Sequence, residues 1–497
     1  MIDALKPYRA YKDSGVPWLG QVPEHWEVRR QRNVVQMLVS TVDKHAIQGE
    51  LPVRLCNYVD VYKNDRITAG IPFMRASASS MEVERFRLKS GDVLITKDSE
   101  AWDDIGVPAL VEYEAPDLVC GYHLAILRPR EGVMRGPFLL RALQSEGVAA
   151  QYHVSANGVT RYGLSHDAIK SVQIPVPTLG EQTAIVRFLD HADRRIRRYI
   201  RAKQKLIKLL GEQKQAIVQR AVTRGLDPNV RLKSSGLEWL GDIPEHWEVR
   251  RLRTIVRRID QGVSPQADAA LADGEAWGVL KAGCVNRGVF RDTEHKRLPN
   301  GFVIDQSLAV HTGDVLVSRA NGSPALVGSV ARVAAIRYQL ILSDKTFRLV
   351  FQEPRIADFA VAAMNTRYWR VQVEQALSGA DGLANNLPLS SLKDFAVALP
   401  PLEEGERIAA VLDGTSGSLT SAILRTDREI TLLREFRTRL IADVVTGKLD
   451  VRAAAAKLPD ESGEPDEVQA LDGAEVEGDN GEPAEDGADA VLEEVKT

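Results

Sequence analysis

A few short strings in this 497-residue chain contain residue types that could do chemistry. Glu294-His295-Lys296, with Asp273 upstream, places acids near a lysine as in metal-dependent nucleases, but so short a match is more often coincidence. Leu399-Pro400-Pro401-Leu402 resembles the Asn/Asp-Pro-Pro-aromatic loop of adenine methyltransferases, yet it lacks the side chain that accepts a hydrogen bond from the base. His25 and His246 each stand beside a tryptophan in a repeated motif, which favours a packed or capped turn.

Other sequence signals of catalysis are missing. No Gly-x-Gly loop follows a predicted strand to hold S-adenosylmethionine, and no Gly-Lys-Ser/Thr loop is present to hold a nucleotide phosphate. Cys56, Cys120 and Cys284 lie far apart without a Cys-x-x-Cys pair, which argues against a disulfide framework or a structural zinc site. We therefore expect no catalytic, metal-binding or cofactor-binding residue, and three reduced thiols in a cytoplasmic protein.

Length and composition indicate several folded units. The chain is too long for one ordinary domain, and its 44% hydrophobic content is enough to build real cores. No apolar run approaches the roughly 20 residues that a membrane helix needs. The polar segment 1–15 also lacks a signal-peptide core, so we expect no membrane association.

The net charge of −4 hides two regions of opposite sign. Residues 451–497 contain 15 acidic and 3 basic residues, so residues 1–450 carry a net charge of +8. The acidic segment has almost no aromatic residues and cannot bury enough apolar surface to offset its chain entropy. We expect a disordered acidic C-terminal tail attached to a modestly basic body.

The body repeats itself. Ser14–Arg32 and Ser235–Arg253 are identical at 14 of 19 positions. This period is too long for a solenoid, whose repeats are about 20–50 residues, so the chain is predicted to contain two copies of one unit of roughly 220 residues. The repetition continues at Gly91–Ile95 with Gly313–Val317, at Pro177–Asp190 with Pro400–Asp413, and at Leu209–Asp227 with Leu432–Asp450.

The first part of each copy is predicted to be a mixed α and β domain. Short β-branched runs broken by Gly, Pro and Asn are typical of strands and loops. The predicted strands are 92–96, 124–127 and 172–176 in copy one and 314–318, 346–350 and 395–399 in copy two, with helical stretches at about 137–151 and 355–376.

The second part of each copy is predicted to be one long helix. Thr178-Leu179-Gly180-Glu181 fits a capping box, and no proline follows until Pro228. A heptad frame has 8 apolar residues among 11 positions in copy one and 7 in copy two, so the helices are predicted to pair as an antiparallel coiled coil. The frames are Ile185, Leu189, Ala192, Ile196, Tyr199, Lys203, Leu206, Leu210, Gln213, Ile217 and Arg220, and Ile408, Leu412, Thr415, Leu419, Ala422, Thr426, Glu429, Leu433, Phe436, Leu440 and Asp443.

The first helix is also strongly basic on its outer faces. Eight Lys and Arg residues fall within the 15 positions from Arg194 to Lys208. Such a stretch is either a solvated helix face or a surface for phosphates or an acidic partner, and the sequence leaves both readings open.

Several of these features together resemble a known family. The string YKDSGVPWLGQVPEHWEV, its second copy, the Gly-Asp-Val-Leu strand and the helix starts PTLGEQ and PPLEEG are similar to the specificity subunit of type I restriction–modification systems. The resemblance covers about residues 8–450. One departure is that Glu181-Gln182 in copy one corresponds to Glu404-Gly405 in copy two, which weakens the second capping and subunit-contact pattern.

The resemblance implies the following organisation. Two similar target recognition domains would each read one half of a split, asymmetric double-stranded DNA site, and the long helices would set the unread gap. The chain would not be an enzyme: two methyltransferase (modification) subunits, joined in the full complex by restriction–translocase subunits, would bind S-adenosylmethionine, ATP and Mg²⁺. The expected segments are domain 1 at 1–177, spacer helix at 178–227, domain 2 at 228–399, spacer helix at 400–450 and tail at 451–497.

Base readout needs polar or basic side chains on loops that reach a DNA groove. Three sets of loop residues fit this need in each copy, and any one of them could instead be an ordinary surface residue. The candidates are Lys63, Asn64, Arg66, Thr96, Lys97, Ser99, Asn157, Thr160, Arg161 and Tyr162 in copy one, and Lys281, Asn286, Arg287, Ser318, Arg319, Asn321, Asn385 and Asn386 in copy two.

Two other classes of function remain open on the sequence. The chain could be a self-sufficient DNA methyltransferase or nuclease with an unrecognised site. It could also be a coiled-coil scaffold with no DNA role, in which case it would show no salt-dependent DNA binding.

Overall fold

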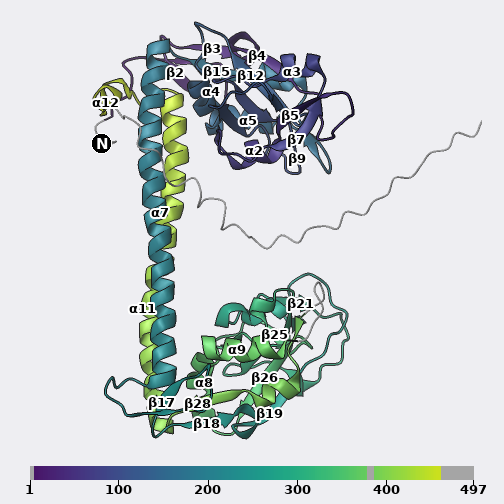
Figure 1. Ribbon diagram of the computed structural model, residues 1–497, viewed down its shortest axis with the longest axis vertical. Coiled ribbons are helices and arrows are strands. Elements are labelled where there is room, and N and C mark those ends of the chain that lie inside the picture. Colours follow the sequence, from purple (N-terminus) through teal and green to yellow (C-terminus); the bar gives the residue numbers. More distant parts are fainter. Residues whose placement is uncertain (1–4, 378–384, 460–497) are drawn as a thin grey trace, which may run out of the picture. The chain divides into compact units, whose positions relative to one another are not determined.

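The structure, a computed structural model, describes residues 5–377 and 385–459 (Figure 1). It divides into two units. Unit 1 contains the chain up to Asp193 together with the residues from Thr438 onward, and unit 2 contains Arg194–Arg437. Both boundaries fall inside long helices, so each unit includes part of each helix.

The main sheet of unit 1 separates two cores. Successive side chains of a strand point to opposite faces, so Val93 and Ile95 face the core that the helices α4 (Gly136–Leu143) and α5 (Glu146–His153) share. Leu94 faces the other core. The spatial order is β4 (Val35–Val39), β12 (Leu124–Pro129), β8 (Val93–Thr96), β10 (Pro108–Val111) and β6 (Arg66–Ile67), antiparallel except for the pair β10 and β6.

A three-stranded sheet covers the second core of unit 1. Its order is β11 (Leu118–Cys120), β5 (Leu51–Cys56) and β7 (Met74–Ala78), with β5 parallel to β11 and antiparallel to β7. Further elements of this unit are β1 (Tyr11–Asp13), β2 (Gln21–Pro23), β3 (Glu27–Arg30), α1 (Gln31–Val34), α2 (Tyr58–Lys63), α3 (Ser80–Phe86), α6 (His166–Ser171) and β15 (Gln173–Val176).

Unit 2 repeats this topology. Its main sheet has the order β19 (Val256–Gln261), β26 (Thr346–Phe351), β22 (Val315–Ser318) and β24 (Val330–Arg332), all antiparallel. Its second sheet has the order β21 (His295–Arg297), β20 (Trp277–Leu280) and β25 (Gln339–Ile341), with β20 parallel to β25. Also present are β16 (Leu232–Ser234), β17 (Asp242–Pro244), β18 (Glu248–Arg251), α10 (Leu389–Asp394) and β28 (Ala396–Leu399). The sequence repeat is therefore a repeat of structure, and the predicted fold class is confirmed.

Each predicted helical stretch between strands is two helices. In unit 1 the break follows α4, where the buried Ser145 donates its hydroxyl to Ala142 O at 2.7 Å. In unit 2 it separates α8 (Ala357–Ala363) from α9 (Arg367–Ala376), where Thr366 donates to Ala363 O at 2.7 Å. A hydroxyl bonded back to the preceding turn competes with the helical backbone bonds, which is how both helices end.

The two long helices are α7 (Leu179–Arg224) and α11 (Leu402–Val445). Within unit 2 they run antiparallel, because Lys203 pairs with Glu429 while Lys214 donates to Thr420 Oγ1 at 2.9 Å. Within unit 1 the start of α7 and the end of α11 share one apolar cluster. The predicted antiparallel pairing is confirmed.

The predicted seam of α7 is right at Lys203, Leu210 and Ile217 but wrong at the alternate positions Tyr199, Leu206, Gln213 and Arg220, which are exposed. Tyr199 and Leu206 are 52% and 44% exposed, whereas Ile200 and Ile207 are less exposed. The seam continues from Ile196 by a second step of four residues, because an α-helix has 3.6 residues per turn and drifts away from a strict 3.5-residue repeat. The less exposed residues after this step are Ile200, Lys203, Ile207, Leu210, Lys214, Ile217 and Ala221.

The segment after α11 is ordered up to Pro459, although the sequence predicted that the disordered tail begins at 451. Residues 452–456 form α12 (Arg452–Ala456), and Val451 and Ala455 pack into the main core of unit 1. Arg187 of α7 donates to Leu458 O at 2.6 Å. A few apolar residues are thus enough to hold this stretch, and the rest of the predicted tail lies outside the described residues.

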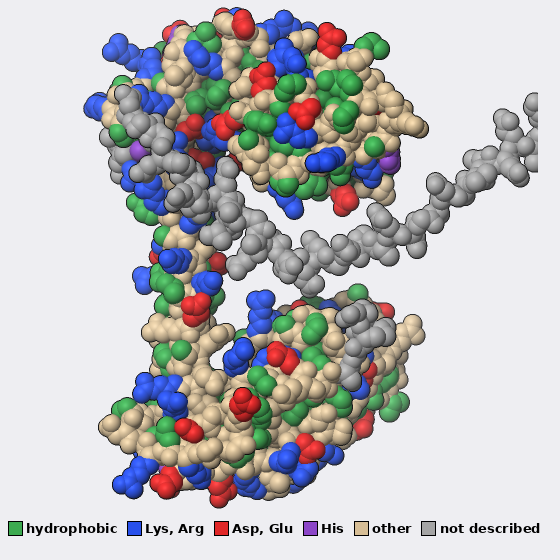
Figure 2. Space-filling view, viewed as in Figure 1, with side chains coloured by type: hydrophobic (Ala, Val, Ile, Leu, Met, Phe, Trp, Pro, Cys, Tyr) green, Lys and Arg blue, Asp and Glu red, His purple; other side chains and the backbone are tan. Residues whose placement is uncertain are grey.

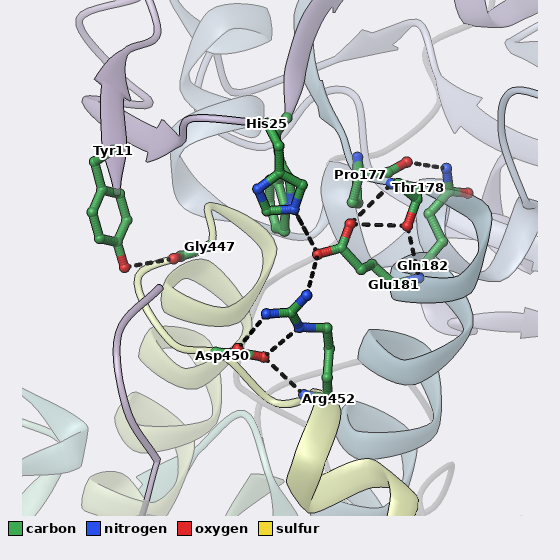
Figure 3. A network of polar contacts seen from close by, with 10 residues as sticks. Tyr11, His25, Pro177, Thr178, Glu181, Gln182, Gly447, Asp450 and Arg452 are labelled. Atoms are coloured by element: carbon green, nitrogen blue, oxygen red, sulfur yellow. Dashed lines mark hydrogen bonds and ion pairs between the residues drawn. The ribbon is translucent and has the colours of Figure 1, made fainter. Parts of the chain in front are cut away.

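The repeated motif meets the start of α7 in unit 1 (Figure 3). Glu181 and Thr178 exchange the reciprocal bonds of the predicted capping box, with Glu181 N donating to Thr178 Oγ1 at 3.3 Å and Thr178 N donating to Glu181 Oε2 at 3.2 Å. The other oxygen of Glu181 accepts from His25 Nε2 at 2.9 Å and from the buried Trp26 Nε1 at 3.4 Å. Burial opposes ionisation of Glu181, but the bonds from His25, Thr178 and Trp26 outweigh it and lower the pKa of this carboxyl.

Unit 2 repeats this junction at the start of α11. Glu404 accepts from His246 Nε2 at 2.7 Å and from Trp247 Nε1 at 3.2 Å. The end of the other long helix packs on the same tryptophan in each unit, since a Cβ on Gly447 would lie 3.1 Å from Trp26 and a Cβ on Gly225 would lie 3.6 Å from Trp247. The histidines therefore hold helix starts, as their neighbouring tryptophans suggested.

The departure at Gln182 and Gly405 has a packing reason. Gln182 is fully buried, accepts from Arg135 N at 2.9 Å and donates to Val133 O and Pro177 O. In unit 2 a Cβ at Gly405 would lie 3.2 Å from Pro400 and 3.8 Å from Phe359. The Gln182 side chain is therefore used up in hydrogen bonds within unit 1 and does not lie on a surface that a partner could contact.

Candidate nucleic-acid interface

The loops predicted to read DNA come together in unit 1. Residues after β8 form β9 (Asp98–Ser99), and residues before the last strand form the hairpin of β13 (Asn157–Gly158) and β14 (Tyr162–Gly163). These three strands make one small sheet in which Tyr162 pairs with Ser99 and Gly163 with Asp98. Two of the three predicted sets in this copy are therefore neighbours.

The third set of unit 1 lies on and after α2. Tyr58 and Tyr62 stack with ring centroids 5.5 Å apart, and Tyr62 donates to Asp104 Oδ2 at 2.6 Å, which raises the pKa of Tyr62 to about 12. Burial raises the pKa of Tyr58, against a hydrogen bond with Ser99 that lowers it. The bond from Tyr62 to Asp104 joins α2 to the loop that follows β9.

The predicted residues of this third set differ in availability. Lys63 is exposed, and Asn64 Nδ2 donates to Asp60 O at 2.8 Å. Arg66 pairs with Glu112 and lies 3.2 Å from Asp190 of α7. Arg66 therefore already serves an internal ion-pair network, while Lys63 is free to face a phosphate.

An ion network organises the small sheet of unit 1. Asp98 Oδ1 accepts from Arg161 Nη2 at 3.0 Å, and Asp98 Oδ2 accepts from His123 Nδ1 at 2.7 Å. Tyr122 lies against His123, with ring centroids 3.7 Å apart. His123 is not among the predicted residues, because no local sequence signal shows that it meets a loop residue 25 positions away.

Other predicted residues of this set face inward. Thr96 is fully buried and its hydroxyl accepts from Val107 N at 3.1 Å. Ser99 is also buried, and its hydroxyl accepts from Ala101 N at 3.3 Å. Lys97 is half-buried, and its backbone bonds to His123 and Leu164. Thr96 and Ser99 thus shape the loop and do not present their side chains to solvent.

The tip of the β13–β14 hairpin is the most exposed part of this face. Val159 is 90% exposed, and Asn157, Thr160 and Arg161 are exposed as well. Trp102, on the loop after β9, is 52% exposed and meets His153 edge to face at 6.4 Å. Val159 is not among the predicted residues, since an apolar residue in a loop carries no binding signal.

In unit 2 the equivalent loop cluster consists of different side chains. Strand β23 (Ala320–Asn321) pairs with β27 (Asn385–Asn386), so that Asn321 lies opposite Asn385 and Ala320 opposite Asn386. Asn321 Nδ2 donates to Asn286 Oδ1 at 3.1 Å, which brings in the third predicted set. All three sets of this copy therefore meet, and they supply carboxamides where unit 1 supplies an ion network.

The remaining candidates of unit 2 differ in burial and in the partners that they contact. Ser318 is fully buried, so it faces the core. Arg319 Nη1 donates to Asp344 O at 2.9 Å, and its guanidinium lies 5.9 Å from the Phe347 ring centroid. Lys281 is half-buried at the start of a 3₁₀ segment. Arg287 is exposed and has φ of 57°, the one positive φ of a non-glycine residue among the described positions.

Charge alone does not outline this interface. Figure 2 shows Lys and Arg side chains interspersed with Asp and Glu on the visible face of each unit, without one continuous basic patch. The loop clusters are therefore defined by their convergence and side-chain chemistry.

The short strings with possible chemistry are structural in the part of the chain that is described. His295 is buried, and its Nε2 accepts from Ala272 N at 2.8 Å. Asp273 pairs with Arg297 at 3.1 Å. Cys56, Cys120 and Cys284 are free and buried. No group of three or more His, Cys, Asp or Glu residues that could hold a metal is found among the described residues.

The paired helices leave apolar side chains uncovered. Within the described residues, no helix is long and apolar enough to cross a membrane. Singly exposed apolar side chains are normal on a protein surface, whereas a contiguous group of them is typical of a protein contact. The exposed set is Tyr199, Leu206 and Leu209 on α7, and Val411, Leu424, Leu432 and Phe436 on α11.

Comparisons with known proteins agree with one another. The family model described as "Type I restriction modification DNA specificity domain" matches residues 23–208. The putative type I restriction enzyme MjaX specificity subunit of Methanocaldococcus jannaschii is 22% identical over 438 residues, 87% of this chain and 96% of that one. The type I restriction enzyme EcoEI specificity subunit of Escherichia coli is 32% identical over 162 residues, 32% of this chain and 27% of that one.

A solved structure has the same fold. It comes from work on the complex assembly and conformational transition of the type I R-M system, and it superimposes with a TM-score of 0.62 at 18% identity, over 86% of this chain and 99% of that chain.

Proposed function

The chain is a specificity subunit of a type I restriction–modification system, and from this premise we propose that it selects a two-part DNA sequence without catalysing a reaction itself. The observation that supports this most directly is the position of the two loop clusters. Both follow the central strand of the main sheet, β8 in unit 1 and β22 in unit 2, on the same duplicated scaffold. A pair of similar scaffolds suits a pair of half-sites.

The half-sites are different sequences in this proposal. In unit 2, the position of Asp98 is occupied by Ala320 and that of Ser99 by Asn321. The position of Tyr162 is occupied by Asn385. A carboxylate-held arginine and a carboxamide pair offer different donors and acceptors to base edges. The asymmetry of the recognised site thus follows from divergence of the loops on a preserved scaffold.

Partner subunits dock on the paired helices. The exposed apolar residues of α7 and α11 supply the buried contact, and surrounding charges supply the polar rim. Two modification subunits would flip the target adenines and bind S-adenosylmethionine, and restriction subunits of the full complex would use ATP and Mg²⁺. The substrate is DNA inside the cell, so the cytoplasm is the place of action.

Exchange of one domain tests the proposal. We replace residues 235–398 by those of a relative and determine the methylated motif of the host genome. One half of the motif should change and the other should stay, because each unit has its own loop cluster. The control is the reciprocal exchange of residues 14–176, which should change the opposite half. A change of both halves after either exchange would contradict the division of labour.

A change in helix length tests whether the two long helices set the unread gap. Insertion of one helical turn in α7 and a matching turn in α11 should widen the unread gap of the methylated motif and leave both half-sites unchanged. Insertion in α7 alone disrupts the pairing of Lys203 with Glu429 and serves as the mismatched control. An unchanged gap in the double insertion would show that the helices do not set the spacing.

A direct assay tests whether the chain alone catalyses a reaction. The purified chain is incubated with DNA, Mg²⁺ and S-adenosylmethionine, and neither cleavage nor methylation is expected. Methyl transfer or cleavage that persists without other subunits would make it an enzyme in its own right.

A further inference from the structure

One arginine of the unit 1 loop cluster is held in place by the protein. Arg161 Nη2 donates to Asp98 Oδ1, and Asp98 is fixed in turn by His123 Nδ1. The Arg161 side chain is 61% exposed, whereas that of Asp98 is 19% exposed. An ion pair at such an exposed arginine adds little stability. Its main effect is to orient the guanidinium, because Nη2 is held by Asp98 while most of the side chain stays exposed.

The hairpin that presents Arg161 is tightly built. A Cβ on Gly158 would lie 2.0 Å from Arg161 O, so the turn between them closes around a glycine. Val159 and Thr160 at the tip are exposed. A two-stranded ribbon of this kind is narrow enough to enter the major groove of B-DNA.

We propose that Arg161, held by Asp98, reads a guanine in the half-site of unit 1. This inference rests on the proposed DNA-reading function and names the base chemistry of one half-site. A guanidinium fork matches the O6 and N7 acceptors of guanine, and the match depends on its orientation. A phosphate contact needs positive charge but no such fixed orientation, and the Asp98 carboxylate would weaken it by partly neutralising that charge.

The effect is confined to one half-site because the described residues of unit 2 contain no acidic residue at the position of Asp98. Ala320 occupies the position of Asp98, and it has no group that could hold an arginine. The neighbouring pair in unit 2 is Asn321 and Asn385. A change at Arg161 therefore leaves the other half of the recognised sequence untouched.

Selection from a random DNA pool tests the inference. The full chain, purified from its host with its bound subunits, selects sequences at a fixed salt concentration. The variants are Arg161→Ala, Arg161→Lys and Asp98→Asn, and the control is Arg54→Ala, which removes a half-buried arginine of β5 that pairs with Asp117, away from the small sheet. Thermal unfolding of each variant shows that it is folded.

The wild type should select a two-part motif. Arg161→Ala should lose the preference for one guanine in one half and weaken binding to the original site by about 5- to 150-fold, the range of a bidentate base contact. Arg161→Lys should not restore the preference, since an ammonium is a point donor. Asp98→Asn keeps the arginine but weakens its support, so discrimination should fall there too. Arg54→Ala should select the wild-type motif.

A modified base locates the contact. Replacement of the guanine by 7-deazaguanine removes the N7 acceptor. It should weaken wild-type binding and have no further effect on Arg161→Ala, because the contact is already absent.

The experiment distinguishes failure of the inference about Arg161 from failure of the proposed function. If Arg161→Ala weakens binding equally on all sequences, lowers the salt dependence by about one counterion and keeps the motif, Arg161 is a phosphate contact and the inference is overturned. If the wild type selects no motif, the proposed function itself fails, and the inference falls with it.

Discussion

Trp247 donates its indole Nε1–H to Glu404 at 3.2 Å, across 157 positions of sequence. The same bond in unit 1 joins Trp26 to Glu181 at 3.4 Å. In each unit the tryptophan is fully buried, the glutamate begins one long helix and a glycine at the end of the other long helix packs on the ring. The repeated Pro-Glu-His-Trp motif is therefore the anchor that attaches the paired helices to each unit.

Replacement of either tryptophan by phenylalanine should destabilise its unit to a similar degree. The change removes a donor from a carboxylate that is buried at Glu181 and half-buried at Glu404, and the free energy of unfolding should fall by about 1–3 kcal/mol for Trp26→Phe and for Trp247→Phe. Thermal unfolding followed by circular dichroism measures both. Trp102→Phe, at a half-exposed tryptophan, is the matched control and should change little. A large effect for one anchor and none for the other would refute their equivalence.

Acid should weaken the unit 1 junction through Glu181. The folded-state pKa of Glu181 is below its ordinary value of 4.5, so the carboxylate stabilises the folded chain fully above that pH. The contribution is lost as pH falls from about 4.5 through the lower folded pKa. The melting temperature of Glu181→Gln should therefore lie below that of the wild type at pH 7, and the gap should narrow below pH 4.5. A gap that is constant from pH 7 to pH 3 would show that the charge of Glu181 is unimportant.

The observed seam of α7 includes Ile196 but not Tyr199, although the predicted seam contains both residues. Ile196 is 6% exposed, so Ile196→Ala should lower the free energy of unfolding by about 2–5 kcal/mol. Tyr199 is half-exposed, so Tyr199→Ala should stay within about 0.5 kcal/mol of the wild type and instead weaken co-purification of the modification subunit. Urea unfolding and pull-down assays measure the two effects. Equal destabilisation by both changes would support the heptad frame that the sequence predicted.

Arg287 should be strained by its left-handed backbone. A non-glycine residue at φ of 57° costs roughly 1–2 kcal/mol relative to glycine, so Arg287→Gly should be more stable than Arg287→Ala by about 1 kcal/mol. Both variants lose the guanidinium and should lose equal DNA affinity. Thermal unfolding and a binding titration compare them. If the two variants are equally stable, the strain is absent, and unequal affinities would show that backbone shape rather than charge matters there.

Much of this protein could be read from the sequence, because the relevant signals are local or repeated. The β-branched run at Val93–Thr96, the capping box at Thr178 and the 14 identities of the repeat identified strands, helix starts and duplication. These depend on backbone preference and on alternation along one strand. The antiparallel pairing of the helices followed from two matching seams.

Tertiary structure decided which candidate residues face outward and which partners they meet. Thr96 and Ser318 have the same hydroxyl group as the exposed Thr160, but the adjoining strands bury them. The bond from Arg161 to Asp98 spans 63 positions and the one from His123 spans 25, so no local pattern contains either of them. The sequence thus determined the scaffold, whose stability comes from periodic burial, while the reading surface was set by contacts between loops that meet only after the sheets have formed.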